Sequence, residues 1–228
     1  MRQHLTKPEQ RVRDAFIAGL KITKRKTAKP AIIAMIGLVG SGKSFVARAL
    51  APVLGATIIE HDQIRIGLRK ARLPYDHVAG IAQDTAHAVI SQGGNVIFDT
   101  DCIGKEKQRN IRKIAKETGS AVFFVRVMCD PDIMLGRMLA SSKKQPGSFF
   151  QGASSLWKGP APQKAAIIKI REMLRRMPHH YRWSEHGGGS WSLKKFSPAP
   201  FTKIDTSDPQ QWKKNIKRTA QKLAARKT

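Results

Sequence analysis

Short apolar runs alternate along the chain with longer segments in which apolar side chains recur at helical intervals. The runs cover residues 31–36, 56–60, 95–99, 121–127 and 201–205. The first of them, AIIAMI, contains no polar residue, which is typical of a strand that is buried on both faces. The helical intervals predict helices at residues 43–54, 76–91, 105–118, 131–140, 163–177 and 209–227. Strands that alternate with helices in this way predict an α/β fold with a parallel sheet covered by helices on both faces.

One more helix is predicted ahead of this alternation. Thr6 and Glu9 have the spacing of a capping box, and apolar residues follow them at helical intervals. A basic linker over residues 21–29 then leads to the first buried strand. We therefore expect a basic accessory helix and linker in residues 1–29, followed by one domain in residues 30–228.

Residues 141–200 interrupt the alternation. Their flanks, 141–162 and 178–200, are rich in Gly, Ser, Pro and Trp, which predicts irregular structure around the helix at 163–177. That helix is predicted to carry basic side chains on one face and apolar side chains elsewhere. The basic residues are Arg171, Arg175 and Arg176, and the apolar ones are Ile167, Ile168, Met173 and Leu174. We expect the whole stretch to form a lid or insert in the domain.

The charge of the chain is high and unevenly distributed. There are 42 Lys and Arg residues against 16 Asp and Glu residues, a formal net charge of +26. Residues 141–200 hold 11 basic and 2 acidic side chains, whereas residues 31–100 hold 6 and 5. The aromatic residues in the basic stretch are Phe149, Phe150, Trp157, Tyr181, Trp183 and Trp191. Basic and aromatic side chains together can bind a nucleic-acid backbone and stack on bases, but these aromatics can equally form a small core of the lid.

The cysteines, the histidines and the start of the chain limit the class of protein. Cys102 and Cys129 lack CxxC spacing, which favours reduced core thiols in a cytoplasmic protein. No carboxylate or thiol stands at ligand spacing from His61, His179 or His180, so no histidine metal site is predicted. The start has no apolar signal, and no apolar run approaches the ~20 residues of a membrane span. We expect no membrane insertion, and the oligomeric state stays open.

The segment GLVGSGKS, residues 37–44, matches the phosphate-binding loop motif and lies between a predicted buried strand and a predicted helix. Its glycines allow backbone N–H groups to turn inward toward phosphate oxygens, and the helix N-terminus adds partial positive charge. Lys43 is expected at the terminal phosphates of ATP and Ser44 at Mg²⁺. The nucleotide-binding residues predicted by the motif are Gly37, Gly40, Ser41, Gly42, Lys43 and Ser44. The alternative is a glycine-rich turn without a ligand.

A second metal ligand is expected where another buried strand ends. The run NVIFD at residues 95–99 places Asp99 at such an end, where a carboxylate can face the magnesium ion. The alternative is that Asp99 caps the next helix, a role that Asp101 could fill instead.

With these residues placed, the chain resembles P-loop kinases with an AAA-type ATP-binding domain, the group that includes polynucleotide 5′-hydroxyl kinases, zeta-type toxins and gluconate kinases. The likeness spans residues 31–227 and rests on the phosphate loop, on EHDQIR, on FDT, on Asp130-Pro131 before the helix that holds Arg137, and more weakly on IDTS. The resemblance implies a three-layer P-loop NTPase fold with a five-stranded parallel sheet and a helical lid. It also implies transfer of the γ-phosphate of ATP to a hydroxyl group.

The resemblance also assigns roles to single residues. Asp62 accepts the proton of the attacking hydroxyl; the alternative is that it only caps a helix that begins near Gln63. Arg65, one turn later, is placed to bind a phosphate of the acceptor. Arg137 matches an arginine at the edge of the lid, close to the nucleotide; the alternative is that it is an ordinary solvated helix residue. The second lid arginine often found one turn further on is replaced by Ser141, which leaves that contact open.

The acceptor is not identified by any motif. The charge distribution favours a nucleic-acid 5′ end or a nucleoside-type acceptor. The alternatives are a small-metabolite or sugar-nucleotide kinase, including a toxin-like one, and a nucleic-acid-binding ATPase without kinase activity.

Overall fold

The computed structural model describes residues 4–143, 166–208 and 210–225 of the 228-residue chain. The helices in these residues are α1 (Lys7–Ala18), α2 (Lys43–Leu54), α3 (His61–Lys70), α4 (Val78–Ser91), α5 (Lys105–Thr118), α6 (Pro131–Lys143), α7 (Ala166–His180) and α8 (Gln211–Ala225). The strands are β1 (Ala31–Ile36), β2 (Ala56–Glu60), β3 (Asn95–Asp99), β4 (Ala121–Met128), β5 (Tyr181–Ser184), β6 (Ser190–Leu193) and β7 (Thr202–Asp205). None of these helices is long and apolar enough to cross a membrane.

A five-stranded parallel sheet with the order β2-β3-β1-β4-β7 forms the centre of the molecule. The connection after β1 leads to β2 on one side of the sheet, and the connection after β3 leads past β1 to β4 on the other side, so the chain leaves the carboxyl ends of β1 and β3 in opposite directions. Ligands of open parallel sheets bind at such a switch point. The predicted α/β P-loop fold with a five-stranded parallel sheet is confirmed.

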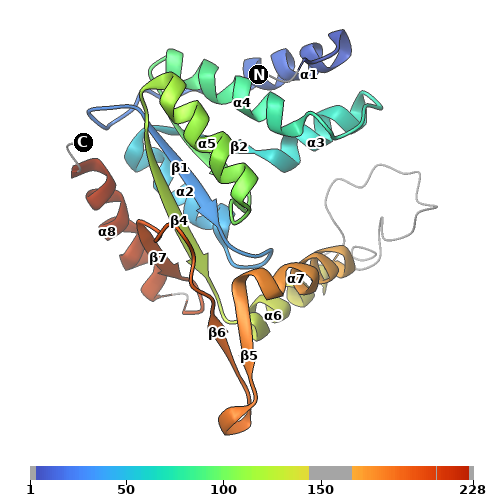
Figure 1. The fold of residues 1–228 in the computed structure, drawn as a ribbon, viewed down its shortest axis with the longest axis vertical. Coiled ribbons are helices and arrows are strands. Elements are labelled where there is room, and N and C mark those ends of the chain that lie inside the picture. Colours follow the sequence, from blue (N-terminus) through green and yellow to red (C-terminus); the bar gives the residue numbers. More distant parts are fainter. Residues whose placement is uncertain (1–3, 144–165, 209, 226–228) are drawn as a thin grey trace.

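Helices cover both faces of the sheet (Figure 1). Successive side chains of β1 point to opposite faces, so Ile32 packs in the cluster under α3, α4 and α5, whereas Ile33 packs in the cluster under α2 and α8. Both residues are almost fully buried. Cys102 and Cys129 are free buried thiols, as the sequence predicts.

The accessory helix α1 lies against α3 and α4 (Figure 1). Its Val12 and Phe16 pack against the same apolar cluster that α3 and α4 form with the sheet. Gly67 of α3 permits the close approach, because a Cβ at that position would lie 3.1 Å from Val12 Cγ1. Helix α1 therefore shares the apolar core of the sheet domain. The boundary between an accessory segment at residues 1–29 and a domain at residues 30–228 stays a prediction.

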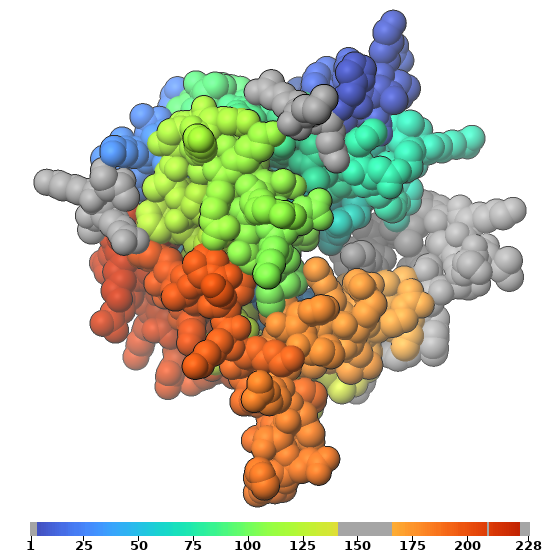
Figure 2. Space-filling view, viewed as in Figure 1, coloured from blue at the N-terminus to red at the C-terminus, as the bar shows by residue number. Residues whose placement is uncertain are grey.

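The region predicted as irregular after residue 178 contains a β-hairpin instead. Strands β5 and β6 pair antiparallel, and the rings of Trp183 and Trp191 lie 4.9 Å apart across them. The hairpin projects from the body of the molecule in Figure 2. Its base, with Tyr181, joins a third apolar cluster that α6 and α7 supply with methionines. This bears out the small-core alternative for Tyr181 and Trp191, while Phe149, Phe150 and Trp157 lie outside the described residues.

Candidate active site

The phosphate loop connects β1 to α2 at the carboxyl edge of the sheet. Gly42 caps α2 in the left-handed conformation, with φ of 85°, which favours glycine. A Cβ at Gly37 would overlap the Val127 carbonyl oxygen, so the loop also packs closely on β4. Ser41 is fully buried, and its Oγ has no hydrogen-bond partner in the described part of the chain. Such an orphaned donor beside inward-facing backbone N–H groups fits a phosphate-binding cradle.

Lys43 opens α2 and is held over this loop. Its Nζ donates a hydrogen bond to the Leu38 carbonyl oxygen at 2.8 Å. Burial lowers the pKa of Lys43, whereas the carboxylates of Asp101 and Asp99 act to raise it. A bound phosphate would raise the pKa of Lys43 in the same way, because a nearby opposite charge favours the charged ammonium.

One cavity of about 990 Å³ adjoins the loop, a volume at the upper end of what ligand pockets usually hold. Its wall includes Gly40, Gly42, Lys43, Ser44, Asp62, Arg65, Asp99 and Arg137. Among the predicted site residues, only Gly37 and Ser41 are absent from this wall, and both lie in the loop itself. The topology thus gathers residues from α2, α3, β3 and α6 around one space.

Asp62 lies in the first turn of α3, because this helix begins at His61 with Glu60 at its cap position. Asp62 is therefore not the capping residue that the alternative interpretation proposed. Its Oδ1 accepts a hydrogen bond from Arg65 Nη1 at 2.6 Å, one turn along the same helix face. The Asp62 side chain is 60% exposed and the Arg65 side chain 37%, so both are accessible from the cavity.

Asp99 and Asp101 follow β3 but have different surroundings. Asp99 ends the strand and lines the cavity. Neither residue caps the next helix, because Gly104 occupies the cap position of α5. The alternative interpretation of both residues as caps is therefore wrong.

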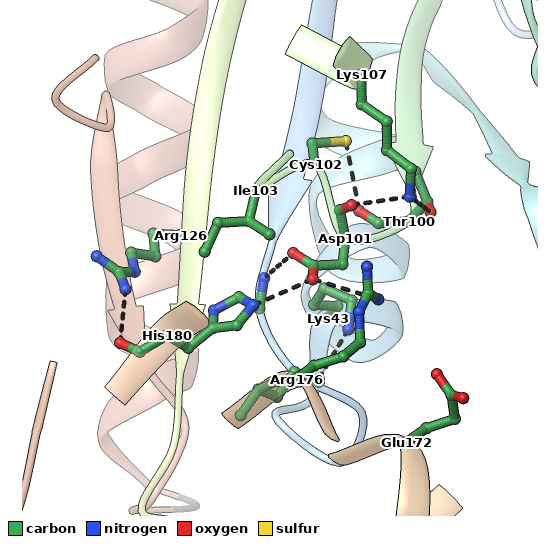
Figure 3. Close-up of polar contacts among 12 residues, drawn as sticks. Lys43, Thr100, Asp101, Cys102, Ile103, Lys107, Arg126, Glu172, Arg176 and His180 are labelled. Atoms are coloured by element: carbon green, nitrogen blue, oxygen red, sulfur yellow. Dashed lines mark hydrogen bonds and ion pairs between the residues drawn. The ribbon is translucent and has the colours of Figure 1, made fainter. Parts of the chain in front are cut away.

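Asp101 is a buried junction between the phosphate loop and α7 (Figure 3). Its Oδ1 accepts from the Gly37 backbone N–H at 3.3 Å, while its Oδ2 lies 3.1 Å from His180 Nε2 and 3.3 Å from Arg176 Nη1. Burial alone would raise the pKa of Asp101, but the hydrogen bond with His180 and the charges of His180, Arg176 and Lys43 lower it to about 2. Asp101 is therefore an anion that holds together two parts of the site.

The carboxyl end of α7 is fixed by a second buried contact. Arg126 of β4 is 1% exposed and donates to the carbonyl oxygens of His180 and Lys194. Tyr181 Oη donates to the Cys129 carbonyl oxygen at 2.8 Å. These contacts seat α7 and the base of the hairpin against the sheet, next to the cavity.

The basic face predicted for α7 is confirmed only in part. Arg171 and Arg175 are exposed, but Arg176 turns inward to Asp101 and, like Arg175, lines the cavity. Leu174, one of the apolar residues expected away from the basic face, is 59% exposed.

Arg137 of α6 also lines the cavity. Its guanidinium donates to the Thr206 carbonyl oxygen and to Thr206 Oγ1, and Thr206 Oγ1 in turn donates to the Ser41 carbonyl oxygen at 2.8 Å. This chain of contacts fixes Arg137 relative to the phosphate loop. The side chain of Ser141 lies outside the described residues.

Lys107 is a cavity residue that no sequence pattern indicated. Its Nζ donates to Thr100 Oγ1 at 3.2 Å and to the Asp101 carbonyl oxygen at 3.0 Å. Asp101, Arg176 and His180 were likewise not assigned to the active site. A polar residue after a buried strand is a local signal that could have indicated Asp101, but the other three depend on contacts between distant segments.

The wall of the cavity fits ATP with Mg²⁺. Ser44 and Asp99 both line the cavity and offer oxygen ligands. The described residues contain no group of three or more His, Cys, Asp or Glu side chains that could hold a metal ion by themselves. This suits Mg²⁺, which is usually held by few protein oxygens together with phosphates and water.

Comparisons with known proteins agree with this fold. The profile of a family described as "AAA domain" matches residues 32–149, just over half of the chain. No curated protein sequence matches. The solved structures with a similar fold include a candidate kinase from Chloroflexus aurantiacus, with a TM-score of 0.54 and 15% identity over 86% of this chain and 97% of that one.

Two further structures are similar at the same level. A gluconokinase from Sinorhizobium meliloti has a TM-score of 0.50 and 16% identity over 86% of this chain and 94% of its own. A structure of the PezAT toxin–antitoxin system of Streptococcus pneumoniae has a TM-score of 0.52 and 12% identity over 98% of this chain and 97% of its own. Identities this low show a shared fold.

Proposed function

The chain belongs to the AAA-domain family, and from this premise we propose that it is an ATP-dependent kinase that transfers the γ-phosphate to the hydroxyl group of an acceptor. The observation that carries the proposal is that one cavity joins the phosphate loop to Asp62 on the neighbouring helix. A loop that only switches on nucleotide binding needs no such carboxylate opposite the phosphates. The solved structures of the same fold include a candidate kinase and a gluconokinase, which supports the proposal.

The residues of this chain have distinct roles in that reaction. Backbone N–H groups of the loop, other than those of Gly37 and Ser41, which donate within the protein, bind the phosphates together with the Lys43 ammonium, and Ser44 and Asp99 hold Mg²⁺. The magnesium ion neutralises phosphate charge when it is bound. Arg137, fixed through Thr206, balances negative charge on the transferred group.

Asp62 supplies the base for the acceptor. The acceptor oxygen forms a bond to the γ-phosphorus, the bond between that phosphorus and the bridging oxygen breaks, and ADP leaves with the electron pair. The hydroxyl proton passes to an Asp62 carboxylate oxygen, which assists late in a loose transition state. The ion pair with Arg65 keeps that carboxylate oriented toward the cavity before transfer.

The test is incubation with γ-labelled ATP and a panel of hydroxyl acceptors, with products separated by mass. We expect label on an acceptor for the parent protein. Lys43→Ala should reduce transfer to background while the thermal unfolding curve stays cooperative, because the charge is needed at the phosphates and the stem is not part of an apolar cluster. Label released only as inorganic phosphate would instead indicate an ATPase, and full transfer by a folded Lys43→Ala variant would refute the phosphate-loop assignment.

A further inference from the structure

Lys107 lies at the boundary of two cavities. Besides the main one, it lines a smaller cavity of about 40 Å³ beside α4 and α5. His61 and Thr100 are likewise shared by both walls. The rest of the smaller wall is mostly apolar, with Ala79, Ala82, Phe98, Cys102, Ile111 and Ile114. The two cavities therefore share part of their walls at Lys107, His61 and Thr100.

The charge of Lys107 is not neutralised by the contacts that hold it. Both of its hydrogen bonds go to uncharged oxygens, the Thr100 hydroxyl and the Asp101 carbonyl (Figure 3). Within the described residues, no carboxylate lies within ion-pair distance of its ammonium, whereas Arg65 pairs with Asp62 and Arg176 pairs with Asp101. Lys107 is thus a partly buried cation whose partners are all neutral.

Two guanidinium groups lie close enough to repel this ammonium. Burial lowers the pKa of Lys107, and the charges of Arg176 and Arg65 lower it as well, whereas Cys102 and Asp101 act to raise it. Like charges brought together at a partly buried site destabilise the folded protein. An anionic ligand between them would reverse this cost, since each cation would gain an opposite charge.

The small cavity also contains a buried hydrogen-bond donor without an acceptor in the described part of the chain. Gln83 lines it, and the buried Gln83 Nε2 has no hydrogen-bond partner in the described part of the chain. A buried amide donor without a partner costs about 1–3 kcal/mol. An acceptor oxygen on a ligand that reaches past Lys107 would satisfy it.

We propose that Lys107 binds an anionic group of the acceptor, so that the substrate is an alcohol that also carries a phosphate or carboxylate group. The proposal rests on the proposed kinase function and narrows its acceptor. In this arrangement the hydroxyl of the acceptor faces Asp62, and its anionic group lies toward α5. The phosphate loop and Lys107 then hold two separate anions, those of the nucleotide and those of the acceptor.

The other role open to Lys107 is purely structural, as a clamp on the loop that follows β3. Lys107→Gln separates the two, because glutamine keeps a donor for Thr100 Oγ1 and the Asp101 carbonyl oxygen while it removes the charge. Lys107→Arg keeps the charge. Lys105→Gln is the matched control, since it removes the same charge from an exposed position on the same helix.

The first measurement is binding by calorimetry, with the protein saturated by a nonhydrolysable ATP analogue so that the phosphate loop is occupied. Inorganic phosphate, glycerol 3-phosphate and glycerol are the probes. We expect the parent protein to prefer glycerol 3-phosphate to glycerol and Lys107→Gln to bind both phosphate probes about tenfold or more weakly. Lys107→Arg and Lys105→Gln should keep the preference. Equal phosphate affinity in the parent and in Lys107→Gln overturns the proposal, as does a parent protein without preference for the phosphorylated probe.

An oligonucleotide with a 5′-hydroxyl group forms the second arm, because its backbone also supplies a phosphate near a hydroxyl. A loss of affinity in Lys107→Gln for the oligonucleotide as well as for glycerol 3-phosphate would extend the anion site to a nucleic acid, and a loss for glycerol 3-phosphate alone would assign the anion to a small metabolite. Either result supports an anionic acceptor. Since no transfer is measured, failure of this proposal is distinct from failure of the kinase assignment, which only the labelled-ATP experiment addresses.

Discussion

Asp62 and Arg65 form a close pair, and the assignment of Asp62 as base depends on what its carboxylate does when an alcohol is present. Asp62→Asn preserves size but cannot accept a proton. We expect its affinity for Mg²⁺–ATP to stay near the parent value and kcat to fall by roughly 10²- to 10⁴-fold. Nucleotide titration and turnover measured on the same preparation check the split.

Asp132 provides a matched control for that variant. It occupies the same position in the first turn of α6 that Asp62 occupies in α3, but it is exposed and lies outside the cavity wall. Asp132→Asn should leave both nucleotide affinity and kcat unchanged. If Asp62→Asn behaves like Asp132→Asn, Asp62 has no chemical role.

Single residues could be predicted from the sequence where a contiguous motif carries them. Lys43 and Ser44 were found because the loop must be continuous to wrap a phosphate. Asp62 was found because the contiguous stretch EHDQIR resembles that of known kinases. Asp101 and His180 meet although 79 positions separate them. Lys107 faces the cavity only because of how α5 is rotated against the sheet. Contacts of this kind depend on packing and leave no local pattern.

At the scale of elements, α1 packs against α4 and against α3, the helix that carries Asp62. The key side chain is Glu9, 2% exposed, whose Oε2 accepts from the Thr6 backbone N–H and whose Oε1 lies 2.7 Å from His77 Nδ1 at the start of α4. Glu9→Ala removes the cap and the contact with α4 together. We expect a loss of about 1–3 kcal/mol in the free energy of unfolding, measured by urea denaturation.

Glu106 is the control for this change, since it lies in the first turn of α5 but is exposed. Glu106→Ala should cost much less than Glu9→Ala. Equal losses for the two variants would mean that α1 is only loosely attached to the sheet domain.

The elements of the sheet domain and helix α7 of the lid were largely predictable, and the hairpin of the lid was not. Helices α2 and α5 and strands β2 and β3 have the predicted bounds, because each has a strong local pattern between turn signals. The β5–β6 hairpin was missed because its strands are only four residues long each and carry few apolar side chains. It is held by ring contacts and by its buried base, which sequence periodicity does not report.

At the scale of the whole molecule, the buried His61 links the stability of the fold to pH. Burial, then the charges of Lys107 and Arg65, lower the pKa of His61 from 6.5 to about 3. Between these values the unfolded chain binds a proton at residue 61 that the folded chain does not. This contribution to stability is therefore complete above about pH 6.5 and is lost as pH falls toward about 3.

We expect this single group to lower the free energy of unfolding on the order of 3 kcal/mol between pH 7 and pH 4. His61→Gln should flatten that part of the profile, measured by denaturation at each pH, whatever its effect at pH 7. Replacement of the exposed His4 by Gln should keep the parent slope. If the free energy of unfolding of His61→Gln falls with pH as steeply as that of the parent protein, residue 61 is accessible to protons in the folded protein.

At this scale, the net positive charge of the chain belongs in part to the candidate active site. The sequence locates the excess of basic residues in 141–200, and part of that excess lines the cavity. Lys169, Arg175 and Arg176 belong to its wall, and Arg176 lies 3.3 Å from Asp101. The net charge therefore does not measure a nucleic-acid surface, since some of these cations belong to the active site.

The contacts of Asp101 couple ligand binding at the phosphate loop to ligand binding beside α7. One carboxylate oxygen accepts from the first glycine of the phosphate loop, and the other binds the helix that borders the acceptor side. A ligand that shifts either partner changes the energy of the other through the same carboxylate. If bound ATP changes the affinity for the acceptor by some factor, the bound acceptor must change the affinity for ATP by the same factor. The order in which the two substrates bind then changes the route to the ternary complex but not its stability.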